Sequence, residues 1–132
     1  MHDYQISWDY ELDDYAKNKD LRLVNKIANH FKNKYLKNLN MFNDFEVNCI
    51  ILSNTKLGVY CSGTSSRPVI GIDLGNLKIA CEEYFVDFEV ALKTTIYHEL
   101  AHAMQEYKEQ ELNEIQAENF ANKLLNNKLI TI

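Results

Sequence analysis

Two histidines and a glutamate in the last third of the chain have the spacing of a metal site. The run His98-Glu99-Leu100-Ala101-His102 has the pattern HExxH. Residues four apart on an α-helix lie on one face, one turn above the other, so the two imidazoles can bind one metal ion. The glutamate beside the first histidine could polarise a water molecule at the metal. The pattern therefore predicts a helix that carries two metal ligands and a catalytic carboxylate.

The residues around this motif favour a metal site over histidines that are ordinary surface or core side chains of an amphipathic helix. Most of the flanking residues are small or apolar, as a buried helix requires: Val90, Ala91, Thr94, Thr95, Ala101 and Ala103. Ionisable side chains on a buried stripe cost free energy unless they are paired or bound to metal. We therefore expect His98 and His102 to bind a cation.

A third ligand is expected downstream. No histidine follows His102, and Lys108 stands where the HExxHxxGxxH pattern has its third histidine, so that pattern is excluded. The segment 111–125 has helical apolar spacing and carries Glu114 and Glu118 on one face. Its alanines would let it approach the metal helix closely. Either glutamate could complete a His-His-Glu site with the fourth tetrahedral position left for water, and such a site favours zinc.

The motif and the segment after it resemble a known family. HELAH followed by EIQAENFA at 114–121 resembles the HExxH…ExxA[N/D]xFA pattern of gluzincin metallopeptidases, in particular the ImmA/IrrE type found on phages, mobile elements and bacterial chromosomes. The resemblance implies zinc bound by His98, His102 and Glu114, with Glu99 as the catalytic carboxylate.

Glu118 occupies the family's Asn or Asp position, which typically steadies a ligating histidine. Because the spacer between the motif and Glu114 is short, Glu118 stays an alternative third ligand.

The resemblance implies a zinc-dependent peptidase. Glu99 would take a proton from the attacking water and deliver it to the departing amine. The expected partner is a protein or peptide substrate, such as a DNA-binding repressor or another regulator of a mobile element. Three tyrosines could steady the oxyanion: Tyr60, Tyr84 and Tyr107.

Two alternatives keep the same fold. The chain could be a zinc-stabilised regulatory or binding protein without peptidase activity, or a toxin or effector peptidase. The intact Glu99 favours an enzyme, because a purely structural site needs no carboxylate there.

The composition is that of one soluble globular domain. The chain has 132 residues, 46% hydrophobic and 25% charged, which suits a single domain over 1–132. A net charge of −5 gives no electrostatic reason to expect nucleic-acid binding. No apolar run is long enough for a membrane span, and the N-terminus is acidic, unlike a secretory signal. Three cysteines without CxxC spacing read as free thiols in a reducing compartment: Cys49, Cys61 and Cys81. We expect a cytoplasmic protein, or one exported without a cleaved signal.

The preceding segments predict a helix and a sheet that support the motif. Residues 20–40 have apolar positions at three- and four-residue intervals, with Asp20 as a plausible N-cap. Strands are expected over three segments: 45–52, 57–61 and 69–74. Residues 75–86 should cross the sheet, with at most a short helical turn. Asp87 should cap the metal helix, 88–107.

These elements predict an α+β fold, similar to a minimal zincin: a backing helix, a three-stranded sheet, the HExxH helix and a C-terminal glutamate helix. Residues 1–19 would form an N-terminal arm. In the family the strand before the last forms the sheet edge above the metal. The resemblance therefore suggests that a substrate strand adds to this edge, along Leu57, Gly58, Val59, Tyr60 and Cys61.

Overall fold

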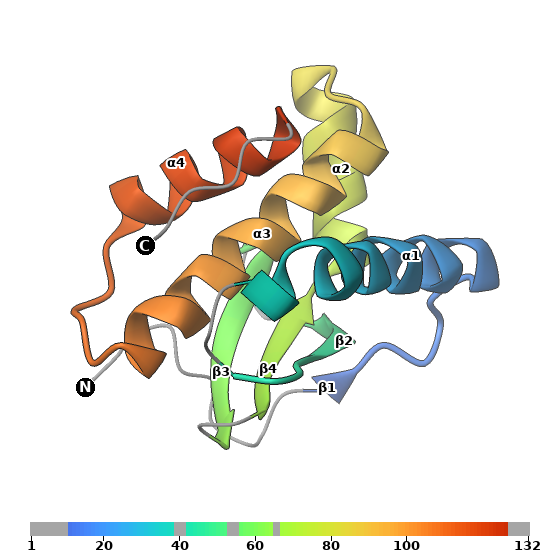
Figure 1. The fold of residues 1–132 in the computed structure, drawn as a ribbon. Coiled ribbons are helices and arrows are strands. Elements are labelled where there is room, and N and C mark those ends of the chain that lie inside the picture. Colours follow the sequence, from blue (N-terminus) through green and yellow to red (C-terminus); the bar gives the residue numbers. More distant parts are fainter. Residues whose placement is uncertain (1–10, 39–41, 53–55, 65–66, 127–132) are drawn as a thin grey trace.

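The computed structural model describes residues 11–38, 42–52, 56–64 and 67–126, with only the backbone described for 59–64. The chain is an α+β unit whose elements follow one another in the order shown in Figure 1. They are β1 (Glu11–Leu12), α1 (Asn18–Lys34), the 3-10 turn Leu36–Asn38, β2 (Glu46–Ile51), β3 (Gly58–Thr64), β4 (Arg67–Ile72), α2 (Leu74–Tyr84), α3 (Phe88–Tyr107) and α4 (Glu114–Leu125).

The three predicted strands are present and form a mixed sheet. The strand order is β1-β2-β4-β3, with β2 and β4 parallel and the other neighbouring pairs antiparallel. The two-residue β1 adds a fourth, short strand beside β2, from a segment predicted to be part of an N-terminal arm. The rest of that arm, residues 1–10, lies outside the described residues. Within the described sheet β3 is an edge strand.

Helix α1 has the predicted amphipathic face but not the predicted cap. Its buried residues follow the three- and four-residue spacing: Val24, Ile27, Ala28 and Phe31. The cap position is Lys17, whose side chain makes no capping hydrogen bond, so the prediction that Asp20 is the N-cap is wrong. Asp20 lies in the first turn and is buried against Lys78 of α2, where the carboxylate and the ammonium form an ion pair. A partner 58 residues away in sequence decides the role of Asp20.

Helix α2 is a correction to the sequence analysis. Residues 75–86 were expected to cross the sheet with at most a short helical turn, yet Leu74–Tyr84 is an α-helix of 11 residues. Asp73 caps it by accepting a hydrogen bond from the backbone N–H of Asn76 at 2.9 Å. Only two of its side chains are buried, so the helical period is weak in the sequence: Leu74 and Leu77.

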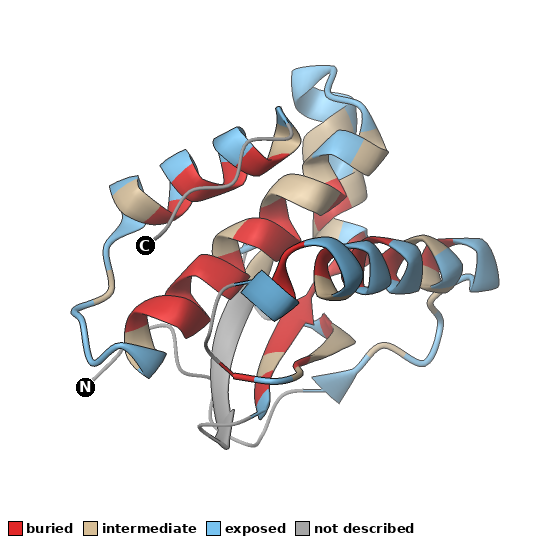
Figure 2. Ribbon diagram, in the orientation of Figure 1, coloured by how far each residue is buried: buried red, intermediate tan, exposed pale blue. Residues whose placement is uncertain are grey.

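Helix α3 occupies the centre of the molecule and has the predicted bounds. The Asp87 carboxylate caps it by accepting from the backbone N–H of Val90 at 3.1 Å. Helix α1 packs on β2, α3 packs on β3 and β4, and α4 packs along α3 (Figure 1). The second half of α3 is therefore buried around most of its circumference (Figure 2).

A glycine lets the sheet edge lie directly on α3. A Cβ at Gly58, the first residue of β3, would stand 2.9 Å from Thr95 Cγ2 and 3.1 Å from the carbonyl oxygen of Gly71. With any larger residue here, either the Thr95 side chain or β3 itself would have to shift. The start of the edge strand is thus held close to the helix turn that carries the motif.

The turn between α3 and α4 is closed by backbone hydrogen bonds. Gln110 N–H bonds to Gln105 C=O and Glu109 N–H to Glu106 C=O, each at 2.9 Å, around Glu109 with its left-handed φ of 57°. Helix α4 then starts three residues later than the predicted segment and buries an apolar face: Ala117, Phe120, Ala121 and Leu124.

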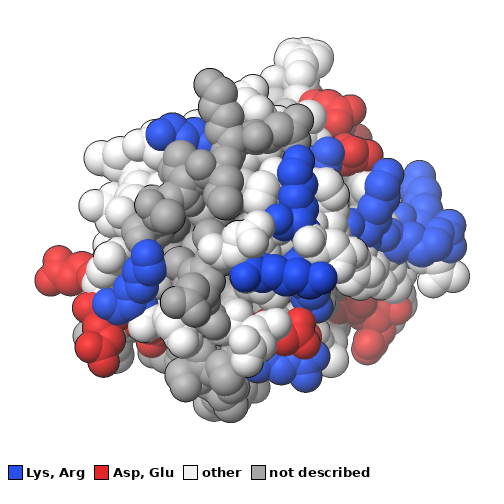
Figure 3. Space-filling model, in the orientation of Figure 1, with Lys and Arg blue, Asp and Glu red and all other residues white. Residues whose placement is uncertain are grey.

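The surface carries both signs of charge. On the face in Figure 3, lysine and arginine side chains gather over α1. No helix among the described residues has the length and apolar character needed to cross a membrane. Cys49 and Cys81 are free thiols, as predicted. The side chain of Cys61 lies outside the part of the chain that the structure describes.

Candidate metal centre

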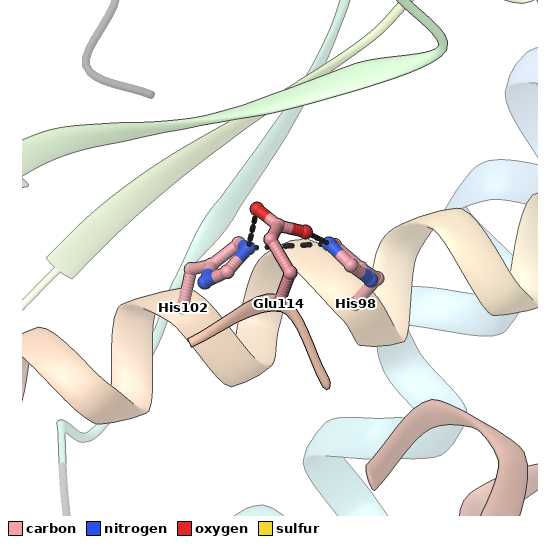
Figure 4. A group of neighbouring side chains, drawn as sticks. All are labelled: His98, His102 and Glu114. Atoms are coloured by element: carbon pink, nitrogen blue, oxygen red, sulfur yellow. Dashed lines mark hydrogen bonds and ion pairs between the residues drawn. The ribbon is translucent and has the colours of Figure 1, made fainter. Parts of the chain in front are cut away.

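Helices α3 and α4 bring two histidines and a glutamate to one point. Glu114 Oε2 lies 2.8 Å from His98 Nε2, and Glu114 Oε1 lies 3.0 Å from His102 Nε2 (Figure 4). The two Nε2 atoms are 3.1 Å apart. A ring nitrogen of each histidine and a carboxylate oxygen of Glu114 all lie within 4.8 Å of one another. The three side chains form a cluster with the dimensions of a metal site.

The outer nitrogen of each imidazole has its own hydrogen-bond acceptor. His98 Nδ1 lies 2.6 Å from Glu118 Oε1, and His102 Nδ1 lies 2.9 Å from Gln105 Oε1. A proton on Nδ1 leaves the Nε2 of a neutral imidazole with its lone pair. Metal-bound histidines nearly always donate their other N–H in this way.

The donor set can hold a divalent metal ion such as zinc. Two imidazole nitrogens and a carboxylate that face each other across about 3 Å repel unless a proton or a metal ion lies between them. Zinc takes nitrogen and oxygen ligands in a tetrahedral arrangement, and three protein ligands leave one position open. His98, His102 and Glu114 are the residues that would hold the ion.

Glu114 and Glu118, the two candidates for the third ligand, face different nitrogens of the histidine rings. The Glu114 carboxylate faces both Nε2 atoms, whereas the Glu118 carboxylate faces Nδ1 on the far side of His98. Asn113 caps α4 by accepting from the Gln116 N–H at 2.9 Å, so Glu114 is the first helical residue and its position depends on that cap.

Glu99 is buried beside the cluster and lacks a hydrogen-bond partner for one oxygen. Its exposed fraction is 7%, and among the described residues Oε1 has no partner. Burial raises the pKa of the Glu99 carboxyl to about 7, against the opposing charges of His98 and Lys56. A carboxyl group with a pKa near neutrality is suited to take and return a proton. Burial also lowers the pKa of His102.

A cleft of about 320 Å³ opens onto the cluster. It is lined from three elements: Lys56, Leu57 and Gly58 at the start of β3, Thr94, Thr95, His98 and Glu99 on α3, and Glu114 and Glu118 on α4. Leu57 and Gly58 of the predicted substrate strand therefore border the cleft. The side chains of Val59, Tyr60 and Cys61 lie outside the described residues.

Sequence reasoning missed two residues at this site. Gln105 is fully buried and contacts His102; its position three residues after the second histidine, on the same helix, was the available signal. Lys56 lines the cleft, whereas Tyr84 and Tyr107 do not. Tyr84 borders a different hollow against α2, and the Tyr107 ring packs against Phe42.

Comparisons with known proteins give one partial similarity. The chain is 32% identical over 92 residues to an NAD kinase of Clostridium beijerinckii, an alignment that covers 59% of this chain and 32% of that protein. The chain thus spans about a third of the length of that relative. No family model matches the chain, and no solved structure matches it.

Proposed function

We propose that this chain is a zinc-dependent metallopeptidase. The observation that carries the proposal is the meeting of His98 Nε2, His102 Nε2 and the Glu114 carboxylate beside the buried, unpartnered oxygen of Glu99. A structural zinc site has no use for such a carboxylate, whereas hydrolysis needs a base at this position. When bound, zinc would act as a Lewis acid toward the scissile carbonyl and the water.

In this mechanism Glu99 moves the proton. Its free oxygen accepts a proton from the water that attacks the carbonyl carbon, and it returns that proton to the departing amine nitrogen as the C–N bond breaks. Glu118 and Gln105 hold the imidazoles in place from the Nδ1 side. Lys56 supplies a positive charge along the cleft.

The substrate in this proposal is an extended peptide that runs along the start of β3. Leu57 and Gly58 border the cleft, and β3 is an edge strand of the described sheet. An edge strand offers backbone N–H and C=O groups to a further strand. The family resemblance suggests that the peptide belongs to a regulator or repressor of a phage or mobile element, cut in a cytoplasmic setting.

The proposal is tested first by metal analysis. Protein purified without chelator should carry about one zinc ion per chain, because three protein ligands converge on one point. His102→Ala and Glu114→Ala should lose the metal. The matched control is Glu111→Ala, which removes an exposed carboxylate from the turn before α4 and should keep it. Wild-type protein without bound metal, even after incubation with zinc, would end the proposal.

The second test is hydrolysis. A peptide library made by digesting bacterial proteins with trypsin, analysed by mass spectrometry, should show new cleavages with the zinc-loaded chain and none after chelation. Zinc binding by the named residues without any cleavage would favour the alternative, a zinc-stabilised regulatory or binding protein. If the chain cleaved only proteins from other organisms and none of the bacterial peptides, the result would favour the toxin or effector hypothesis.

The similarity to an NAD kinase makes phosphotransfer a competing proposal. It spans about a third of that enzyme. Phosphorylation of NAD by the purified chain in the presence of ATP and magnesium, unaffected by His102→Ala, would favour that function over peptide hydrolysis.

A further inference from the structure

The side-chain amide of Gln105 is fully buried and has four polar neighbours. Gln105 Oε1 lies 3.1 Å from the backbone N of Asn113 and 2.9 Å from His102 Nδ1. Gln105 Nε2 lies 3.1 Å from the backbone O of Asn113 and 2.7 Å from Gln116 Oε1. The amide therefore connects the second histidine of the motif with the first turn of α4.

The backbone of Asn113 fixes which end of this amide is oxygen. A backbone N–H can only donate and a backbone C=O can only accept. The Gln105 atom that faces the Asn113 N–H must therefore be Oε1, and the atom that faces the Asn113 C=O must be Nε2. Rotating the amide by 180° would put two donors together and two acceptors together, at a cost of several unmade hydrogen bonds.

The orientation of the amide in turn decides where His102 carries its proton. An oxygen faces each ring nitrogen of His102: Gln105 Oε1 lies 2.9 Å from Nδ1, and Glu114 Oε1 lies 3.0 Å from Nε2. A metal ion can lie between Nε2 and the carboxylate, whereas the fixed amide oxygen of Gln105 is satisfied only by a proton on Nδ1, so we place the single proton of the neutral ring there and the lone pair on Nε2. This lone pair points to Glu114 and His98. The two hydrogen bonds to Asn113 also hold the residue that precedes Glu114 and caps α4.

We propose that Gln105 is a positioning residue that sets the tautomer of His102 and, through the backbone of Asn113, the placement of Glu114. One amide thus prepares two of the three side chains for a metal ion before any ion binds. The assignment of the His102 tautomer concerns the metal-free protein and goes beyond the peptidase proposal. The expected effect on zinc affinity rests on that proposal.

The test compares two substitutions that remove different parts of the amide. Gln105→Met is close in size and removes all four hydrogen bonds. Gln105→Glu keeps an oxygen for His102 Nδ1 and the Asn113 N–H, and loses the donor to the Asn113 C=O and to Gln116 Oε1. Gln116→Met is the control, because it removes one contact of the amide and leaves His102 untouched.

The tautomer of His102 is read from the ring nitrogen shifts in ¹⁵N NMR of the metal-free protein, at an alkaline pH where both imidazoles are neutral. Wild type, Gln116→Met and Gln105→Glu should show a protonated Nδ1. Gln105→Met should shift His102 toward a protonated Nε2. A wild-type protein with the proton on Nε2 would overturn the inference by itself, even if neither Gln105 variant folded.

Zinc affinity gives the second readout. Gln105→Met should bind zinc about 10–100-fold more weakly than wild type, as expected when an outer partner of a metal ligand is removed. Gln105→Glu should recover most of that loss, although both variants lose bonds to the α3–α4 turn. Equal losses of zinc affinity in the two variants, with an unchanged His102 tautomer, would mean that Gln105 is merely structural. If wild type binds no zinc at all, the peptidase proposal fails while the tautomer assignment is still judged by NMR.

Discussion

Asp73 and Glu99 are both acidic and buried to almost the same extent, with exposed fractions of 5% and 7%. Asp73, between β4 and α2, accepts from the Asn76 N–H at 2.9 Å on one oxygen and from the Leu52 N–H at 2.8 Å on the other. Glu99, within α3, has an oxygen without a partner among the described residues. Burial is the same, but one carboxylate is satisfied and the other is not.

Under the proposed function this difference separates a structural carboxylate, Asp73, from a catalytic one, Glu99. Asp73 joins the end of β2 to the start of α2, and its own backbone N–H bonds to Leu57 C=O at the entry to β3. A buried polar atom without a partner costs free energy that folding alone does not explain. Tyr35 Oη and Glu106 Oε2 also lack partners among the described residues, but of the three only Glu99 lines the cleft beside His98, where the proposed peptidase would need a base.

The largest effect expected from this comparison is on hydrolysis. Glu99→Gln should lower the rate of peptide cleavage by about 10²–10⁴-fold, because the amide cannot accept the proton of the attacking water. Zinc content should be unchanged. The midpoint of urea unfolding should not fall, since a neutral amide costs less to bury than an unpartnered carboxylate. A variant that cleaves at the wild-type rate, or that unfolds as readily as an Asp73 variant, would remove the distinction between the two carboxylates.

A smaller effect is expected at Glu118. Glu118→Ala removes the acceptor of His98 Nδ1 and should weaken zinc binding about 10–100-fold, measured by competition with a chromophoric chelator. Asn119→Ala, an exposed neighbour on the same helix, is the control and should bind zinc normally. Complete loss of the metal, as expected for Glu114→Ala, would instead make Glu118 a ligand.

Asp73 should affect stability alone. Asp73→Ala leaves the Asn76 and Leu52 N–H groups without their acceptor and should lower the free energy of unfolding by about 1–2 kcal/mol. Urea denaturation of the zinc-free protein measures this. The comparison variant, Asp87→Ala, removes an exposed cap with one backbone partner and should cost less. Zinc affinity that drops in Asp73→Ala by more than the stability loss would contradict a purely structural role.

The smallest effect concerns the third buried acid of the described part, Asp20, which has a single cationic partner. Lys78→Met should lower the free energy of unfolding by about 0.5–1 kcal/mol. The effect is small because the Lys78 ammonium is partly exposed, and solvent weakens its attraction to the buried Asp20 carboxylate. The difference from wild type should shrink in concentrated salt, which screens the pair. An undiminished difference in salt would instead place the effect in the contact between the Lys78 ammonium and the Phe88 ring, whose centroid lies 5.7 Å from Nζ.

Local sequence was sufficient for the elements that depend on neighbouring residues. The amphipathic spacing predicted α1, and Asp87 marked the start of α3 because a cap acts on backbone N–H groups two to three residues away. The i, i+4 spacing of His98 and His102 placed both rings on one side of α3 before any fold was known. Helix α2 was missed because its burial comes from two leucines and a distant ion pair, which leave little periodicity.

Contacts between elements lay beyond the reach of the sequence. Glu114 and Glu118 are equivalent by helical spacing, and only the packing of α4 on α3 sends one carboxylate to Nε2 and the other to Nδ1. The spacing of Gln105 from His102 was readable in the sequence, but its bonds to Asn113 were not, because they form only where the α3–α4 turn brings Asn113 back beside α3. The sequence by itself determined which residue types share a helix face, because that follows from the helical repeat. The tertiary structure decided which of them meet across helices, because such contacts depend on the docking of whole elements and on no local pattern.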